Sequence, residues 1–234
     1  MTSVPNHSTP AALLASLRAN LPAALPTTMT ASGRKPTAGN DLYEAYLFGL
    51  VVEAAKAVGY AVSYRTALGP ASKLHLRRSP GRICSAGPHG SAFTHALLEY
   101  PGRPALELHT GVVIAGRSKV VHEADVLVLP EADATRARIA NIDPPSARTR
   151  LLVEAKYYTS PVGLPTSREF LGLSKDLSTG KMVFACTLSN ASATALLAGT
   201  PSVEYDVGVL PFRDGETSFR HFTQRLLRDY RDRR

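Results

Sequence analysis

Three apolar stretches in the middle of the chain restrict its fold more than any other feature. They span residues 105–116, 119–129 and 151–157, and aliphatic side chains dominate each of them. Runs of this kind, bounded by glycine, proline or polar residues, are typical of buried β-strands. Because only the short loop 116–118 separates the first two runs, we expect them to form a hairpin. The sequence therefore predicts a central β-sheet.

Further strands and helices are predicted on both sides of these runs. Shorter extended segments are expected at residues 60–68, 73–78, 92–100, 181–189 and 203–211. Helices are expected at Ala11 to Ala19, 41–58, 165–178, 190–199 and in the C-terminal tail from Arg220. Strands joined partly by hairpins and partly by helices form a mixed sheet. The fold class is therefore predicted to be α/β, with a central mixed sheet flanked by helices.

Residues suited to begin or end a helix accompany several of these segments. The expected N-caps are Asn40 or Asp41 for the segment 41–58, Thr166 or Ser167 for 165–178, and Asn190 for 190–199. Gly59 is suited to end the first of these helices. Apolar residues cover most of the circumference of that helix, which indicates that it is buried. An acid on it, Glu44, therefore needs an explanation.

The composition divides the chain of 234 residues into three parts. Residues 1–40 are rich in Ser, Thr, Pro and Ala, and they are predicted to form an N-terminal arm with one short helix. Residues 41–215 carry the strand and helix patterns of one domain, which is long enough to bury a core. Residues 216–234 are predicted to form a basic C-terminal helix. The connection 131–149 is long and polar, and we expect a short helix within it.

The overall composition disfavours a membrane protein and a secreted one. Hydrophobic residues make up 44% of the chain, which is ordinary for a globular protein. No stretch approaches the ~20 apolar residues that a membrane span needs. The run 11–17 has no basic residue before it and lacks the form of a secretory signal. Cys84 and Cys186 are far apart in the sequence, which favours reduced thiols and a cytoplasmic location.

The formal net charge is +8, and the positive charge is unevenly distributed. The segment 73–82 contains no acid, and the tail 220–234 has more arginines than acids. The cations in the first segment are Lys73, Arg77, Arg78 and Arg82. Such patches suit a polyanion, most simply a nucleic acid, because Lys and Arg displace the counterions of phosphates. A surface that only keeps the protein in solution is an equally good explanation of the charge.

Ionisable residues lie inside two of the apolar runs, where a sheet normally carries aliphatic side chains. Because side chains alternate along a strand, Glu123 and Asp125 are expected on one side of their strand, and Glu154 and Lys156 on one side of theirs. Carboxylates in a sheet need cations, and a divalent metal supplies the most charge. With no cysteine nearby and with His122 facing the other way, Mg²⁺ or Mn²⁺ is favoured over zinc. These groups are suited to metal-assisted phosphodiester hydrolysis.

The segments "EAD" (123–125) and "VEAK" (153–156) resemble the D…(D/E)xK signature of the PD-(D/E)XK nuclease superfamily. That family has a restriction-endonuclease-like core of the form α-β-β-β-α-β, which the predicted elements reproduce with extra strands. By this resemblance, Asp125 and Glu154 are metal ligands and catalytic acids, and Lys156 is the catalytic lysine. The Ala155 carbonyl is a further ligand, and Glu44 matches an acid that family members carry on the first core helix.

The resemblance implies a Mg²⁺- or Mn²⁺-dependent nuclease, most simply an endonuclease that acts on DNA. The backbone of the nucleic acid is expected to contact Lys73, Arg77, Arg78, Arg82 and Arg168. A homodimer is an expected assembly, because cutting two strands favours two sites. Two alternatives stay open: a catalytically inactive nucleic-acid-binding module of the same fold, and a metal-dependent hydrolase of small phosphoesters.

Simpler explanations of the individual residues also stay open. Asp125 could be satisfied by a neighbouring arginine or by a backbone amide. Glu154 and Lys156 could form an exposed pair on an edge strand. Glu123 could pair with Lys119 or Arg117. The histidines His109 and His122 are interpreted as ordinary strand residues rather than metal ligands.

Overall fold

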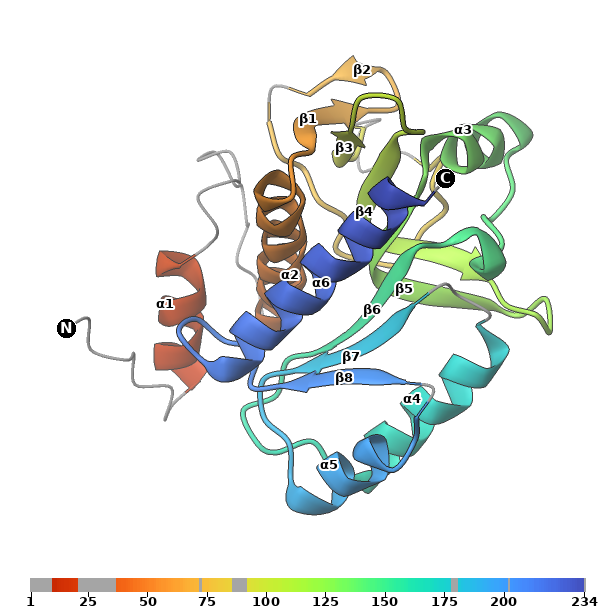
Figure 1. Cartoon of the computed structure of the whole chain (residues 1–234). Helices are drawn as coiled ribbons and strands as arrows, with labels where there is room; N and C mark the ends of the chain where they lie inside the picture. Colours follow the sequence, from red (N-terminus) through yellow and green to blue (C-terminus); the bar gives the residue numbers. More distant parts are fainter. Residues whose placement is uncertain are drawn as a thin grey trace.

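A mixed eight-stranded sheet in the order β2-β1-β3-β4-β5-β6-β7-β8 lies at the centre of the computed structural model (Figure 1). The structure describes residues 10–20, 37–71, 73–85, 92–177, 181–201 and 203–233. Within these residues the strands are β1 (Ala61–Thr66), β2 (Gly69–Pro70), β3 (His95–Glu99), β4 (Leu106–Ala115), β5 (Val121–Pro130), β6 (Leu151–Lys156), β7 (Met182–Cys186) and β8 (Glu204–Val207). Neighbouring strands from β2 to β6 are antiparallel, whereas β6, β7 and β8 are parallel. The predicted α/β class and mixed sheet are therefore confirmed.

Helices cover both faces of the sheet (Figure 1). They are α1 (Pro10–Ala19), α2 (Thr37–Ala57), α3 (Glu131–Ala140), α4 (Leu164–Asp176), α5 (Ala191–Ala198) and α6 (Asp214–Asp232), with a 3₁₀ turn at Ser146–Arg148. One buried cluster joins α1, α2 and α6 to one face, and a second joins α3, α4 and α5 to the other. The crossovers through α4 and α5 make β6, β7 and β8 parallel, as expected for strand–helix–strand units.

The helices predicted at the two ends of the chain belong to this folded unit. Leu13 and Leu17 of α1 are buried in the cluster that contains α2. Phe219 and Leu227 of α6 are fully buried in the same cluster, and Arg220 pairs with Glu53 of α2. The C-terminal helix is therefore amphipathic, with an apolar face in the core and a basic face outside. Much of the predicted arm, residues 1–9 and 21–36, lies outside the described residues.

Two of the predicted N-caps are wrong, and one is confirmed. Helix α2 begins at Thr37, so that Asp41 lies inside it, where its carboxylate pairs with Arg78 at 2.7 Å. Helix α4 begins after Gly163 and starts with Leu164 and a proline in its first turn, so that no side chain caps it. The Asn190 side chain does cap α5, accepting a hydrogen bond of 2.8 Å from the Ala193 N–H.

The segment 73–78, which was predicted as a strand, forms no regular strand. Only an isolated bridge lies within it, and the chain continues as a loop toward Ile83. Part of this loop runs along β4: the Gly81 N–H donates to the Gly111 carbonyl at 3.1 Å, and the Val113 N–H donates to the Gly81 carbonyl at 3.0 Å. The loop therefore occupies the edge of β4 beyond the point where β3 ends its pairing at Leu108.

The alternation of side chains along β4 and β5 is interrupted at one level of the sheet. On β4, Leu108 packs with α2, whereas Val112 packs in the cluster of α3 and α4. Gly111, between them, has a φ of +59°, a conformation that favours glycine. The register places Asp125 of β5 opposite Gly111, and the ladder skips this position. Asp125 therefore lies at a local kink of the sheet.

Among the helices of the described segments, none reaches the length and apolar character required to cross a membrane.

Candidate active site

The two central acids lie where β5 and β6 separate. The antiparallel pairing of these strands ends at Val126 and Val153, whereas β6 continues beside β7 as far as Lys156. Asp125 and Glu154 are the next residues beyond the last pair. In place of a ladder hydrogen bond, the Asp125 Oδ2 accepts a hydrogen bond of 2.6 Å from the Ala155 N–H. The separation of the strands therefore gives one carboxylate access to the backbone of its neighbour.

An ion pair occupies the other side of this junction. The Lys156 Nζ lies 2.5 Å from the Glu154 Oε1, and both side chains are mostly buried. Because β6 has β5 on one side and β7 on the other, this pair does not sit on an edge strand. The simple explanation by an exposed edge is therefore excluded. An ammonium group in this place partly compensates the negative charge of the neighbouring acids.

Burial and neighbouring negative charge raise the pKa of three acids in this region. Burial, followed by the charge of Glu154, raises the pKa of Asp125 to about 7, although Lys156 and the Ala155 amide act in the opposite direction. Burial, followed by the charges of Asp125 and Glu123, raises the pKa of Glu44 to about 9. The pKa of Glu123 is raised by burial and then by Glu154.

These couplings show that helix α2 brings Glu44 into electrostatic contact with acids of β5. Four carboxylates, those of Glu44, Glu123, Asp125 and Glu154, therefore share a partly buried region with one lysine. We call these five residues the acidic cluster. A cation bound among them would offset the repulsion that raises the pKa values, because the ionised carboxylates would then be paired.

Of the predicted ligands, Glu154 pairs with Lys156, Asp125 lies beside both, and Glu44 is near enough for the charges of Asp125 and Lys156 to act on it. Ala155 contacts Asp125 through its backbone N–H, whereas its carbonyl was the predicted metal ligand. Within the described residues, Glu123 forms no ion pair with Lys119 or Arg117, and the charges that act on it are those of Glu154 and Lys156, so that alternative is wrong. The ligand atoms of the acids are not tightly gathered. Among the described residues, a tighter group of three possible metal ligands lies elsewhere, on β3 and β4. Its ligand atoms are within 4.8 Å of one another.

The predicted nucleic-acid contacts have different environments. Lys73 and Arg168 are exposed. Arg78 pairs with Asp41, and Arg82 pairs with Asp143 at 3.3 Å, yet both arginines keep much of their side chain exposed. These four cations are placed where a polyanion has access to them, although two of them already have acidic partners.

The prediction that Arg77 contacts nucleic acid is corrected here, because its side chain is buried. It is only 7% exposed, and its guanidinium donates to the Ser85 hydroxyl at 2.7 Å and to the Arg82 carbonyl at 2.6 Å. The same group lies over the Phe93 ring, 4.2 Å from its centroid. Arg77 therefore holds the loop 77–85 together, and we withdraw it from the predicted contacts with nucleic acid.

A second polar cluster, which was not predicted, consists of His95, Glu107, His109 and Arg138. Its signal in the sequence is the pattern "ELH" (107–109), which places an acid and a histidine on the same side of a strand. His109 was predicted to be an ordinary strand residue, whereas this spacing brings it against Glu107. His95 and Arg138 come from other elements, and no local pattern connects them to β4.

Comparisons of the chain with protein-family models, with curated proteins and with solved structures found no match. The resemblance to a nuclease family therefore stays a prediction from the "EAD" and "VEAK" segments and the predicted order of the elements.

Proposed function

We propose that this protein is a metal-dependent nuclease that hydrolyses phosphodiester bonds, with DNA as the favoured substrate and Mg²⁺ or Mn²⁺ as the metal. The observation that carries the proposal is the position of Asp125, Glu154 and Lys156 at the separation of two central strands. There, within the described part of the chain, one lysine pairs with a set of partly buried acids. Such a set is expected to attract a hard divalent cation.

The order of the elements supports the same proposal. Helix α2 is followed by the antiparallel strands β4, β5 and β6, then by α4 and by β7, which is parallel to β6. This succession corresponds to the α-β-β-β-α-β core that the resemblance implies, with β1, β2, β3 and β8 as additional strands. We therefore propose that the sheet contains a restriction-endonuclease-like core.

The residues of the acidic cluster fit the roles that hydrolysis requires. Asp125 and Glu154 would hold the cation, with Glu44 as a further ligand from α2, and the cation would supply a Lewis acid and a water of lowered pKa. Lys156 adjoins both acids, and its ammonium group can hold a water or stabilise negative charge on a phosphate. The oxygen-only donor set fits Mg²⁺ and Mn²⁺ better than zinc.

A basic surface would complete such an enzyme. Lys73, Arg78, Arg82 and Arg168 are available for contacts with phosphates, and α6 presents further arginines outside the core. Contacts of this kind position a nucleic acid without reading its sequence.

The proposal is tested by incubating the purified protein with plasmid DNA, linear DNA, single-stranded DNA and RNA, each with Mg²⁺ or with EDTA. We expect Mg²⁺-dependent products from at least one polymer and none in EDTA. The double variant Asp125→Asn, Glu154→Gln serves as the inactive control. Salt-sensitive binding of DNA without any products would support the inactive binding module instead. Turnover of small phosphoesters in preference to every polymer would identify the other alternative.

A further inference from the structure

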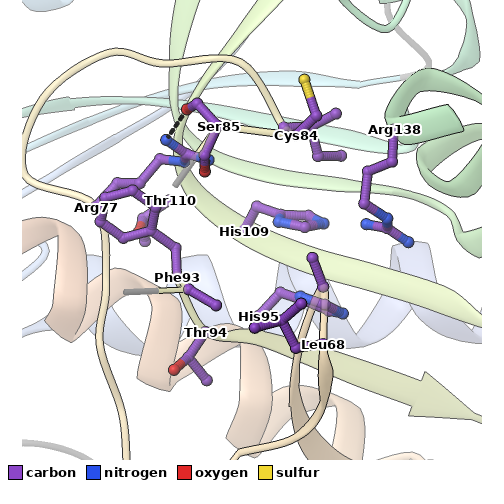
Figure 2. A pocket seen from close by; sticks show the side chains of 13 residues that line it. Leu68, Arg77, Cys84, Ser85, Phe93, Thr94, His95, His109, Thr110 and Arg138 are labelled. Carbon is purple, nitrogen blue, oxygen red and sulfur yellow. Dashed lines mark hydrogen bonds between the residues drawn. The ribbon is translucent and has the colours of Figure 1, made fainter. Parts of the chain in front are cut away.

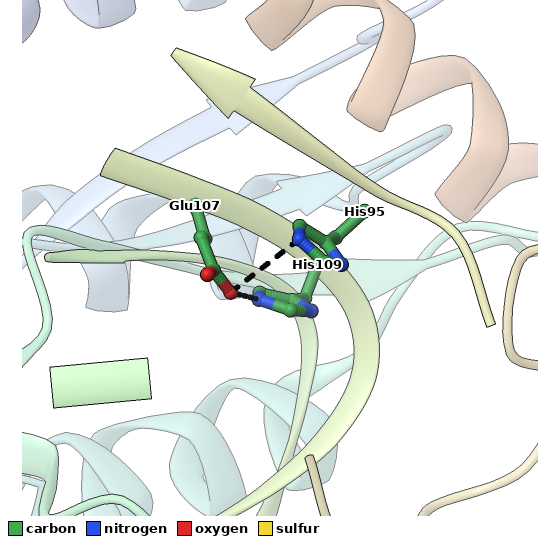
Figure 3. A group of neighbouring side chains, drawn as sticks. All are labelled: His95, Glu107 and His109. Carbon is green, nitrogen blue, oxygen red and sulfur yellow. Dashed lines mark hydrogen bonds and ion pairs between the residues drawn. The ribbon is translucent and has the colours of Figure 1, made fainter. Parts of the chain in front are cut away.

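Three buried side chains with metal-binding groups, none of them part of the acidic cluster, meet on β3 and β4 (Figure 3). Glu107 and His109 are two residues apart on β4, so their side chains are on the same side of the strand. The pairing of Ala96 with Leu108 places His95, the first residue of β3, next to His109. The three residues are 1–7% exposed. We call them the His-Glu-His group.

The potential ligand atoms of this group converge on one carboxylate oxygen. The His109 Nε2 lies 2.8 Å from the Glu107 Oε2, and the His95 Nε2 lies 3.8 Å from the same oxygen. All three atoms are within 4.8 Å of one another. Bonds of about 2.0–2.2 Å to a tetrahedral ion separate ligand atoms by roughly 3.4 Å. Side-chain shifts of about 1 Å, including rotation of the two stacked imidazole rings, would therefore suffice to bind an ion.

Arg138 of α3 fixes the carboxylate of the group from the other side. Its guanidinium contacts both Glu107 oxygens, at 2.7 Å and 2.5 Å. Carboxylates that bind metals are commonly held in this way by hydrogen bonds from a second residue.

The group adjoins a cavity of about 150 Å³ (Figure 2). Its lining includes His95, His109 and Arg138, together with Thr110 and Phe93. The cavity therefore has room for a small ligand beside the two imidazoles.

We propose that His95, Glu107 and His109 bind a divalent transition-metal ion of the Zn²⁺ type, whose open coordination position faces this cavity. Two imidazoles and one carboxylate suit such an ion better than Mg²⁺, which separates this site from the oxygen-only acidic cluster. Because Arg138 already balances the charge of Glu107, a bound dication leaves the site positive. The open position therefore favours a small anion or hydroxide. A purely structural network centred on the Glu107–Arg138 pair is the competing explanation.

The test measures Zn²⁺ binding to metal-stripped protein by competition with a chromophoric chelator. We expect one tight equivalent in the unchanged protein, and an affinity more than about tenfold weaker in His95→Ala and in Glu107→Gln. His221→Gln, an exposed histidine on α6, is the matched control and should bind as the unchanged protein does. The double variant Asp125→Asn, Glu154→Gln should also keep this equivalent, because the acidic cluster is a separate site.

A second measurement does not depend on the folding of any variant. Co²⁺ added to the unchanged, metal-stripped protein should give the intense visible absorption that is typical of a low-coordinate site with nitrogen ligands. A weak spectrum of the octahedral, oxygen-ligated type would overturn the proposal. Zn²⁺ binding that is equally tight in His95→Ala, with the variant folded by circular dichroism, would overturn it as well.

Discussion

The Asp125 carboxylate of β5 accepts a 2.6 Å hydrogen bond from the Ala155 N–H of β6, just beyond the last backbone pair of the two strands. A side chain thus takes the place of a ladder partner at the centre of the sheet. The neighbours of this contact on β6 are Glu154 and Lys156, which form an ion pair of 2.5 Å. This contact links the kink at Gly111 and Asp125 to the acidic cluster. The candidate active site therefore lies where the regular pairing of the sheet is interrupted.

The acidic cluster is predicted to make the metal-free protein less stable as the pH rises. The folded-state pKa values of Asp125 and Glu44 are raised, to about 7 and about 9, so the folded state binds protons more tightly than the unfolded state does. The stability that these groups contribute is present below their unfolded pKa and is lost as the pH rises through the folded values.

Glu44→Gln should therefore raise the free energy of unfolding at about pH 9 by at least about 1 kcal/mol, with a smaller effect near pH 5. Urea denaturation in EDTA at the two pH values measures the difference. Glu169→Gln, an exposed acid on α4, is the control and should change little. A Glu44→Gln variant that is less stable than the unchanged protein at about pH 9 would contradict the account of this acid.

Lys156→Ala is predicted to abolish Mg²⁺-dependent cleavage while nucleic acid still binds. The ammonium group is the cation next to Asp125 and Glu154, and its loss removes the group that would hold a water or stabilise the phosphate. We expect a loss of at least about a hundredfold in the cleavage rate, as for other positioned charges. Single-turnover cleavage and a binding assay in EDTA separate the two effects. Lys175 is an exposed lysine on α4, and the control variant Lys175→Ala should cleave normally. Normal cleavage by Lys156→Ala would refute the catalytic role of Lys156.

Gly111→Ala is predicted to destabilise the protein through the kink opposite Asp125. Its φ of +59° costs a non-glycine residue about 1–2 kcal/mol, and an added Cβ would lie 3.0 Å from the Arg77 Cβ. Thermal denaturation should show a lower melting temperature. At Gly172, inside α4, an added Cβ meets nothing within 4 Å, so Gly172→Ala should instead stabilise the protein by about 1 kcal/mol. Equal effects of the two substitutions would argue against the kink.

Arg77 and Arg168 are predicted to have opposite roles in binding and stability. Arg168→Ala should weaken binding of DNA and make the dependence of log affinity on log salt shallower by about 1, because one phosphate contact is lost. Arg77→Ala should leave that slope unchanged and lower the stability, since the buried guanidinium bonds Ser85 and the Arg82 carbonyl. Salt titrations of binding together with thermal melts decide between the roles. A shallower slope for Arg77→Ala would restore it as a contact.

The main elements of the fold were predictable because their patterns are local. The apolar runs that became β4, β5 and β6 and the cap at Asn190 needed no knowledge of distant contacts. The start of α2 and the irregular path of 73–78 were not predictable, because tertiary contacts decide them. Asp41 pairs with Arg78 instead of capping its helix, and the loop continues along β4 through Gly81.

The residues of the candidate site could be predicted from the sequence, but their arrangement in space could not. Acids within apolar strands indicated Asp125 and Glu154, and an acid on a buried helix indicated Glu44. The strict alternation that was assumed for β5 fails at Asp125, because a kink produced by Gly111 of another strand interrupts it. Contacts between distant elements bury Arg77 and bring His95 close to Glu107. Such contacts cannot be predicted from the charge of a segment or from the pattern of a strand.

The most direct test of the central claim is a calorimetric titration of the metal-stripped protein with Mg²⁺ and Mn²⁺ at about pH 8, where Asp125 is mostly ionised. We predict binding in the unchanged protein that weakens as the pH is lowered through about 7, because protons compete for the same carboxylates. Asp125→Asn and Glu154→Gln should each reduce the affinity strongly, whereas the exposed control Glu169→Gln should not. Equal affinity in all four proteins would contradict a metal site at the separation of β5 and β6.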